Sequence, residues 1–296
     1  MTDGMRTRFG RVVDELLDTD ERVAVVYAVI GTREFGAAGR RHVDRVVDVG
    51  IREQAMVGVA AGMALEGFRP IVHSYAPFLV ERPYEQIKLD FAHQGVGGVF
   101  VSIGASYDAA ASGRTHQAPE DVALMATIPG MQIHVPGHPD EVEALLRRIV
   151  PGEGLHYVRL STRTNARALP ADGSLKVVRG ARPGSPTVVA VGPMIDPVLE
   201  ATSGLDVGVV GTTTVRPLDG DALRGLAGAD VILVEPMLEG TSLPAVTAAL
   251  ADRPRRYLAI GVPAVEHRRY GTADEHDRAH GLDAEGLRRR ITAFVA

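Results

Sequence analysis

The sequence predicts an α/β protein of two three-layer domains, each built on a mostly parallel sheet. Helical periodicity alternates with short, uninterrupted apolar runs, which are typical of strands buried on both faces. The length of 296 residues, 45% of them hydrophobic, is enough for two sizeable cores. Beyond the middle of the chain the periodicity fades and Arg, Pro, Gly and Ser accumulate, which indicates a linker between the domains.

The first domain is expected to cover residues 1–165. It opens with an amphipathic helix, whose apolar residues recur at helical spacing: Phe9, Val12, Val13, Leu16 and Leu17. Apolar runs then predict five buried strands, separated by stretches long enough for helices: 23–27, 70–74, 99–103, 131–135 and 156–160.

Residues 166–186 are the expected linker, and the second domain is expected to cover residues 187–296. Short apolar runs again predict buried strands with helices between them: 187–191, 206–210, 231–235 and 257–260. A helix over 287–294 closes the chain. This pattern predicts a second, smaller α/β unit.

Composition excludes several classes of protein. A formal net charge of -5 provides no basic footprint for nucleic acid. No apolar run approaches the roughly 20 residues that cross a bilayer, and the first residues lack the apolar core of a signal peptide, so we expect a cytoplasmic protein without membrane contact. With no cysteine, disulfides and thiolate chemistry are excluded.

An acidic residue stands at the entrance of an unusually apolar helix. After Glu53 nearly every residue to position 64 is small or apolar, so the helix should be buried on most sides, and Gly58, Ala61 and Gly62 would admit another backbone. A carboxyl group buried there needs a partner or a raised pKa. The alternative is a first-turn acid favoured by the helix dipole.

Residues 50–56, Gly-Ile-Arg-Glu-Gln-Ala-Met, resemble the thiamine-diphosphate glutamate motif of transketolases and deoxyxylulose-phosphate synthases. The resemblance implies that Glu53 is catalytic: it donates a hydrogen bond to the aminopyrimidine ring of the cofactor and so activates it. A dry setting would keep this carboxylic acid protonated. Ile51 is expected beside the cofactor.

A second block, residues 74–86, resembles the aromatic element of the same family. The resemblance implies that Phe78 stacks on the pyrimidine ring and that Tyr75 lies alongside it. The alternative is that Phe78 belongs to the core, where large apolar residues usually pack.

A third block, residues 112–121, resembles the family's Asp-Gly-Pro-Thr-His-Gln loop. The resemblance implies that His116 faces the substrate and transfers protons. Otherwise a loop histidine is usually solvated or hydrogen-bonded locally. The second domain, with Glu235 and Gly240, resembles the transketolase C-terminal domain, so the likeness covers nearly the whole chain.

The diphosphate-binding domain of the family, with its Gly-Asp-Gly element, is not found in this sequence. We therefore expect a partner, an N-terminal (alpha) subunit that holds Mg²⁺ against the diphosphate of thiamine diphosphate, and no metal ligand in this chain. Because the family builds its site between protomers, the expected assembly is an alpha2beta2 heterotetramer.

Several positions depart from the sugar-phosphate pattern. Ser112 and Arg114 replace the Asp and Pro of the loop, the phosphate-facing histidine falls on Gly104, and Val29 replaces an Asp. Substrate recognition is therefore expected to differ. Ser112 and three arginines are candidate substrate ligands, since guanidinium suits phosphate or carboxylate, although surface arginine is the alternative for each: Arg6, Arg114 and Arg163.

Three functions are compatible with these residues. The first is a split transketolase-like transferase, the beta subunit of an enzyme that moves a ketol or acyl-anion unit from a ketose or 2-oxo acid donor to an aldehyde through a thiamine-bound carbanion. The second is a decarboxylating enzyme, resembling either the synthases or the beta subunit of a 2-oxo acid dehydrogenase. The third is a non-catalytic scaffold or regulatory subunit.

Overall fold

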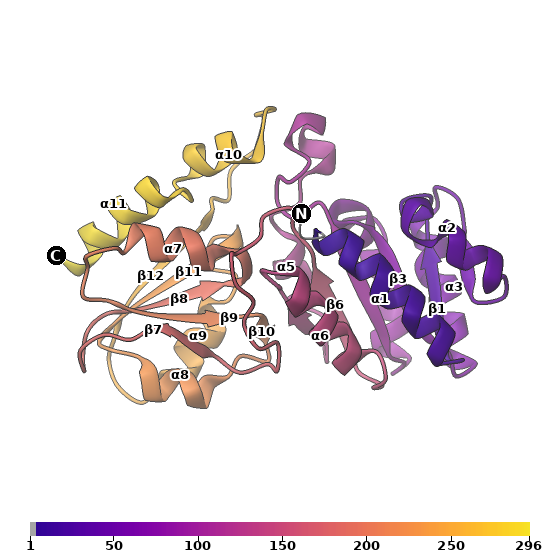
Figure 1. Ribbon diagram of the computed structural model, residues 1–296, viewed down its shortest axis with the longest axis horizontal. Helices are drawn as coiled ribbons and strands as arrows, with labels where there is room; N and C mark the ends of the chain where they lie inside the picture. Colours follow the sequence, from indigo (N-terminus) through magenta and orange to yellow (C-terminus); the bar gives the residue numbers. More distant parts are fainter. Residues whose placement is uncertain (1–3) are drawn as a thin grey trace.

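The computed structural model describes residues 4–296 and has two β-sheets, each covered by helices on both faces (Figure 1). Both sheets are mixed and mostly parallel, so the predicted α/β class is confirmed. Within the described residues, no helix is both long and apolar enough to cross a membrane.

The first sheet has seven strands in the order β10-β5-β6-β4-β3-β1-β2. All neighbours pair in parallel except β10 and β5, which are antiparallel. The strands are β1 (Val23–Tyr27), β2 (Val46–Asp48), β3 (Arg69–Tyr75), β4 (Gly98–Ile103), β5 (Gln132–His134), β6 (Leu155–Arg159) and β10 (Thr214–Arg216). The five strands predicted for the first domain are thus present.

Helices cover this sheet on both sides. One core contains buried residues of α1 (Met5–Thr19), α2 (Thr32–Arg41) and α6 (Pro139–Ile149). The opposite core contains residues of α3, the π-helices η1 and η2, and α5. Their bounds are α3 (Glu53–Leu65), η1 (Pro77–Glu81), η2 (Ile87–His93) and α5 (Asp121–Ala126). A short helix, α4 (Tyr84–Gln86), lies between the two π-helices, and two 3-10 turns, η3 (Ala110–Ser112) and η4 (Arg114–His116), follow β4.

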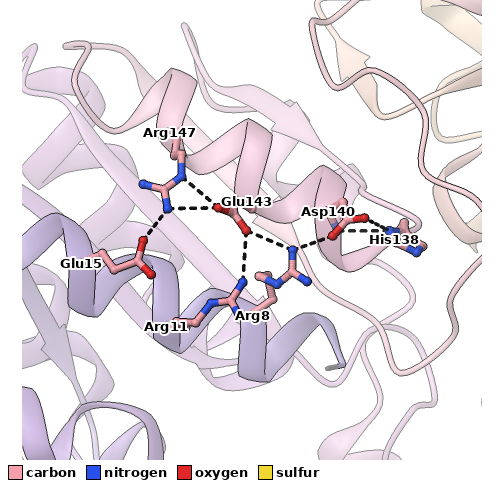
Figure 2. A network of polar contacts seen from close by, with 7 residues as sticks. All are labelled: Arg8, Arg11, Glu15, His138, Asp140, Glu143 and Arg147. Atoms are coloured by element: carbon pink, nitrogen blue, oxygen red, sulfur yellow. Dashed lines mark hydrogen bonds and ion pairs between the residues drawn. The ribbon is translucent and has the colours of Figure 1, made fainter. Parts of the chain in front are cut away.

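Ion pairs bind α1 to α6 on the outside of the first sheet (Figure 2). Arg8 Nη1 lies 2.6 Å from Asp140 Oδ1 and 3.0 Å from Glu143 Oε2, and Arg147 bonds both Glu143 and Glu15. Single exposed pairs stabilise a protein by about 0–1 kcal/mol, but a network also fixes orientation. The pairs therefore hold α1 and α6 side by side on one face of the sheet.

The second sheet has five strands in the order β12-β11-β8-β9-β7. They are β7 (Lys176–Arg179), β8 (Thr187–Val191), β9 (Gly208–Thr212), β11 (Asp230–Leu238) and β12 (Arg256–Val262). Figure 1 shows the helices in layers above and below this sheet. On one side lie α7 (Ile195–Ala201), α10 (Ala273–His280) and α11 (Ala284–Val295), and on the other lie α8 (Gly220–Leu226) and α9 (Leu243–Ala249). The 3-10 turn η5 (Gly192–Met194) precedes α7.

Two strands cross the expected division of the chain. The segment 166–186, expected as a plain linker, contains β7, which pairs antiparallel with β9. Residues 214–216, expected in the second domain, form β10 and join the edge of the first sheet, where Thr214 pairs with His134. Both strands are short edge strands without a continuous apolar run, so periodicity does not reveal them.

A buried ion pair connects the first sheet to α5. Arg159, at the end of β6, donates to both carboxylate oxygens of Asp121, at 2.8 and 3.0 Å, and both side chains are buried. Tyr157 donates to the same carboxylate at 2.7 Å, and Arg159 Nη2 donates to Ser106 Oγ at 2.6 Å. The loop after β4 is therefore attached to β6 and α5 through one arginine.

Loss of this carboxylate should destabilise the protein strongly. In Asp121→Ala, Arg159 keeps a buried charge without its partner, and we expect unfolding to become easier by about 3–5 kcal/mol. Chemical denaturation measures the change. The matched control is Asp206→Ala, which removes the exposed partner of Arg182 and should change stability by about 0–1 kcal/mol. Equal losses in the two variants would contradict the assigned role of Asp121.

Candidate functional site

The residues of the three motifs lie at the carboxyl ends of parallel strands in the first sheet. Tyr75 is the last residue of β3, Glu53 begins α3 shortly after β2, and His116 ends η4 in the connection that follows β4. Ligands of open α/β sheets bind outside this edge. The topology thus brings the predicted residues to the expected edge of the sheet.

Three predicted residues form an aromatic cluster. The ring centroid of His116 lies 5.1 Å from that of Phe78 and 5.7 Å from that of Tyr75, both in edge-to-face arrangement, and the Tyr75 and Phe78 centroids are 6.1 Å apart. His116 Nδ1 is 2.9 Å from Thr115 Oγ1, which fixes the ring. An imidazole is therefore held beside an aromatic platform.

Glu53 is linked to this platform by a residue that the sequence did not single out. Its side chain is buried, with 5% of the residue exposed, and Arg82 Nη1 donates to Glu53 Oε1 at 2.7 Å. The Cζ atom of Arg82 lies 3.9 Å from the ring centroid of Phe78. One planar, N–H-bearing group thus contacts both residues expected to hold the aminopyrimidine ring. The spacing of four between Phe78 and Arg82 was the available signal, because such residues share a helix face.

This arrangement fits an aminopyrimidine ring. The guanidinium of Arg82 is flat like such a ring and occupies a position between the carboxyl group of Glu53 and the face of Phe78. The sequence predicted that a carboxyl group buried here needs a partner or a raised pKa, and the structure supplies a partner, since Arg82 pairs with Glu53 at 2.7 Å. The sequence did not identify Arg82 because this residue follows η1, which only the tertiary fold brings near α3.

The turn before α3 is fixed by one carboxylate. Asp48 Oδ1 accepts hydrogen bonds from the backbone N–H of Val29 at 2.9 Å and of Gly50 at 3.0 Å. Val29 has φ 64, a strained value for a β-branched residue, and such strain persists where surrounding contacts enforce it. Asp48 therefore joins the loop after β1, where Val29 departs from the family pattern, to the turn before α3.

The candidate substrate ligands are not gathered into one anion site. Ser112 is exposed in η3. The three arginines are each engaged by a carboxylate: Arg6 with Glu34, Arg114 with Glu120 and Arg163 with Asp277. No group of three or more His, Asp or Glu side chains between residues 4 and 296 is arranged to hold a metal ion.

One face of α3 is open. The expectation that this helix is buried on most sides is wrong within the chain, because Val59 is 40% exposed and Leu65 is 56% exposed. Ile51, expected beside the cofactor, is 74% exposed just before the helix. A Cβ added to Gly62 would meet nothing within 4 Å. Part of the apolar surface of α3 is therefore not covered by the described residues of the chain itself.

Residues 4–167 match the family model described as transketolase, pyrimidine binding domain. The chain belongs to the thiamine-diphosphate-dependent transketolase family.

The chain is 46% identical over 298 residues to the "Uncharacterized 33.6 kDa protein in fasciation locus" of Rhodococcoides fascians, covering 98% of this chain and 95% of that protein. It is 34% identical over 315 residues to 1-deoxy-D-xylulose-5-phosphate synthase 2 of Geobacter sulfurreducens, covering 97% of this chain but 48% of that protein. The chain thus spans about half the length of this synthase.

Solved structures show the same transketolase-type fold. A chain described as "Split gene transketolase, inactive beta4 tetramer" superposes with a TM-score of 0.83 at 24% identity, covering 99% of both chains. A transketolase mutant from Pichia stipitis superposes with a TM-score of 0.78 at 16% identity, covering 100% of this chain and 46% of the other. At these identities the likeness concerns the fold alone.

Removal of the Arg82 side chain should help a transketolase-family cofactor to bind. In Arg82→Met the guanidinium no longer competes for Glu53 and Phe78, and because the Arg82 side chain is 44% exposed we expect the pair to contribute about 1 kcal/mol. We expect thiamine diphosphate to bind the chain, assembled with the expected alpha subunit, roughly fivefold more tightly. Calorimetry measures the affinity, and Lys88→Met, a change at an exposed position of η2, is the control. Weaker binding in Arg82→Met alone would contradict the competition.

Proposed function

We propose that this chain is the C-terminal, or beta, subunit of a split transketolase-like enzyme that transfers a ketol or acyl-anion unit to an aldehyde acceptor. The observation that carries the proposal is that Glu53 and Phe78 contact one flat, hydrogen-bonding group, that of Arg82, while His116 lies against the Phe78 ring. The family supplies the cofactor, thiamine diphosphate, which when bound stores the electron pair of the transferred unit.

Each residue has a defined task in this proposal. Phe78 provides the apolar face on which the pyrimidine ring stacks, with Tyr75 beside it. Glu53 forms the hydrogen bond to a ring nitrogen that activates the cofactor, and its burial protects this bond from water. His116, within reach of both rings, moves a proton to or from the substrate. Ile51 contacts the cofactor from the rim.

The partner is proposed to be an N-terminal, or alpha, subunit that holds Mg²⁺ and the diphosphate in an alpha2beta2 assembly. Three observations support it. The chain spans about half of the synthase that it resembles, the superposed split transketolase is described as an inactive beta4 tetramer, and α3 exposes an apolar face beside Glu53. We also propose that residues 1–165 and 187–296 are the two domains, with β7 and β10 crossing between them.

A decarboxylating enzyme is the second candidate, because the curated relative at 34% identity is a 1-deoxy-D-xylulose-5-phosphate synthase. The two functions differ in whether the donor loses carbon dioxide. Release of carbon dioxide from pyruvate by the reconstituted complex favours the second candidate, and transfer from a ketose without gas release favours the first.

Replacement of Glu53 by Gln tests the proposed cofactor role. Proton transfer by a positioned side chain typically contributes about 10²–10⁴-fold, so exchange of the thiazolium proton in the Glu53→Gln complex should slow by a factor in that range. Hydrogen–deuterium exchange followed by NMR measures it. The matched control is Glu66→Gln, an exposed change at the other end of the same helix. Exchange within a few-fold of the unmodified complex would overturn the role of Glu53.

A charge on the open face of α3 tests the proposed partner surface. Val59→Glu should leave the isolated chain folded, because the side chain is already 40% exposed, yet block assembly with the alpha subunit by burying a carboxylate. Analytical ultracentrifugation measures the assembly. Val177→Glu, an equally polar change on exposed β7, is the control and should assemble normally. Normal assembly of Val59→Glu would place the partner elsewhere.

A further inference from the structure

A cavity adjoins the aromatic cluster on the side of Tyr75. Its volume is about 160 Å³, and its lining includes Arg6, Tyr75, Gly104 and Asp108. A second cavity of about 200 Å³ lies between the residues of the two sheets and shares Asp108, Ser161 and Thr162 with the first. Together these two cavities form what we call the crevice, which begins beside Tyr75 of the aromatic cluster.

The guanidinium groups that line the crevice are already neutralised. Arg6 makes a bidentate pair with Glu34, at 2.7 and 2.9 Å, and the Glu34 side chain is almost wholly buried. The other two are Arg163, paired with Asp277, and Arg159, paired with Asp121. Asp277 also accepts a hydrogen bond from Tyr107 at 2.6 Å. No lining arginine among the described residues is therefore left to neutralise a phosphate.

Asp108 stands at the junction of the two cavities and forms no ion pair with a described residue. Its Oδ1 accepts from the hydroxyl groups of Ser161 at 3.1 Å and Thr162 at 2.9 Å, and its Oδ2 accepts from the Thr162 backbone N–H at 2.9 Å. A carboxylate offers about four acceptor positions, so Oδ2 retains capacity for another donor. A substrate hydroxyl can supply that donor, whereas a phosphate dianion cannot.

Gly104 has no side chain that could bind a phosphate. It has φ +75, and a Cβ placed there would lie 2.2 Å from Cδ1 of Tyr75. The Tyr75 ring thus fills the position at which the family resemblance places a phosphate-facing histidine. No larger side chain fits there unless Tyr75 moves.

The loop that carries Asp108 is held in place on both sides. Ser106 adopts φ 49, its Oγ donates to the carbonyl of Pro236 at 2.5 Å, and the same oxygen accepts from Arg159 at 2.6 Å. The strained conformation is therefore enforced by contacts from both sheets. Asp108 is fixed in the crevice wall rather than carried on a loose loop.

We propose that the crevice binds the uncharged, hydroxyl-bearing end of the substrate and excludes a phosphate ester, with Asp108 as the residue that determines this specificity. The inference rests on the proposed ketol transfer and names its substrate class. A phosphate next to an ionised Asp108 meets like-charge repulsion that no lining arginine offsets. A polyol end instead donates to the carboxylate.

The test uses an unreactive matched pair, xylitol and D-xylitol 5-phosphate, with the complex of both subunits loaded with thiamine diphosphate and Mg²⁺. Burial raises the pKa of Asp108, so binding is measured at about pH 8 to favour the ionised form. We expect calorimetry to show at least about tenfold tighter binding of xylitol. Equal or tighter binding of the phosphate, or no binding of either compound, overturns the proposal.

Two variants locate the cause of the selectivity. Asp108→Asn keeps the side-chain shape without the charge and should reduce the preference for xylitol by about tenfold. Asp277→Asn frees Arg163 and should tighten binding of D-xylitol 5-phosphate. The control is Asp274→Asn, an exposed acid lining the same crevice, which should change the ratio less than about twofold. An unchanged ratio in both of the first two variants overturns the proposal.

Turnover separates this inference from the proposed function. Ketol transfer to glycolaldehyde is measured with D-xylulose and with D-xylulose 5-phosphate as donors. If neither donor reacts while xylitol still binds preferentially, ketol transfer is wrong and the polyol selectivity stands. If D-xylulose 5-phosphate is the better donor, ketol transfer stands and the selectivity is wrong.

Discussion

The structure depends on a carboxylate that cannot be left alone. Glu53 is buried at the start of a helix with almost no polar side chains, and an unpaired charge in such a place is strongly unfavourable. In the chain by itself Arg82 supplies the partner and lies flat on Phe78. The same requirement explains why a flat, hydrogen-bonding ring is a suitable occupant: it satisfies Glu53 and covers Phe78 at once.

The second constraint is that one face of α3 is left open by the described residues of this chain. α3 is apolar on its buried face, packed against the first sheet, and apolar again on the face that is open. A soluble monomer rarely leaves such a face uncovered, which favours an interface. Cofactor binding and subunit assembly are therefore expected to be coupled, since Glu53 begins the helix that we propose as the interface.

The sequence predicted those strands and motifs that a local pattern of residues determines. The apolar runs 23–27 and 187–191 coincide with β1 and β8, because strands buried on both faces leave a continuous signal. β2 and β10, each of three residues, were missed because such short strands leave no apolar run. The convergence of Tyr75, Phe78 and His116 followed from motif resemblance. The pairing of Arg82 with Glu53, 29 positions apart, and of Arg6 with Glu34 depends on tertiary contacts that no local pattern encodes.

We propose that Glu53 and Phe78 exchange Arg82 for the pyrimidine ring of thiamine diphosphate when the partner binds. A crystal structure of the assembled complex with cofactor tests this exchange. We expect a Glu53 carboxyl oxygen within about 3 Å of a pyrimidine nitrogen, the ring stacked on Phe78 and Arg82 moved away. A cofactor bound elsewhere, with Glu53 still bonded to Arg82, would contradict it.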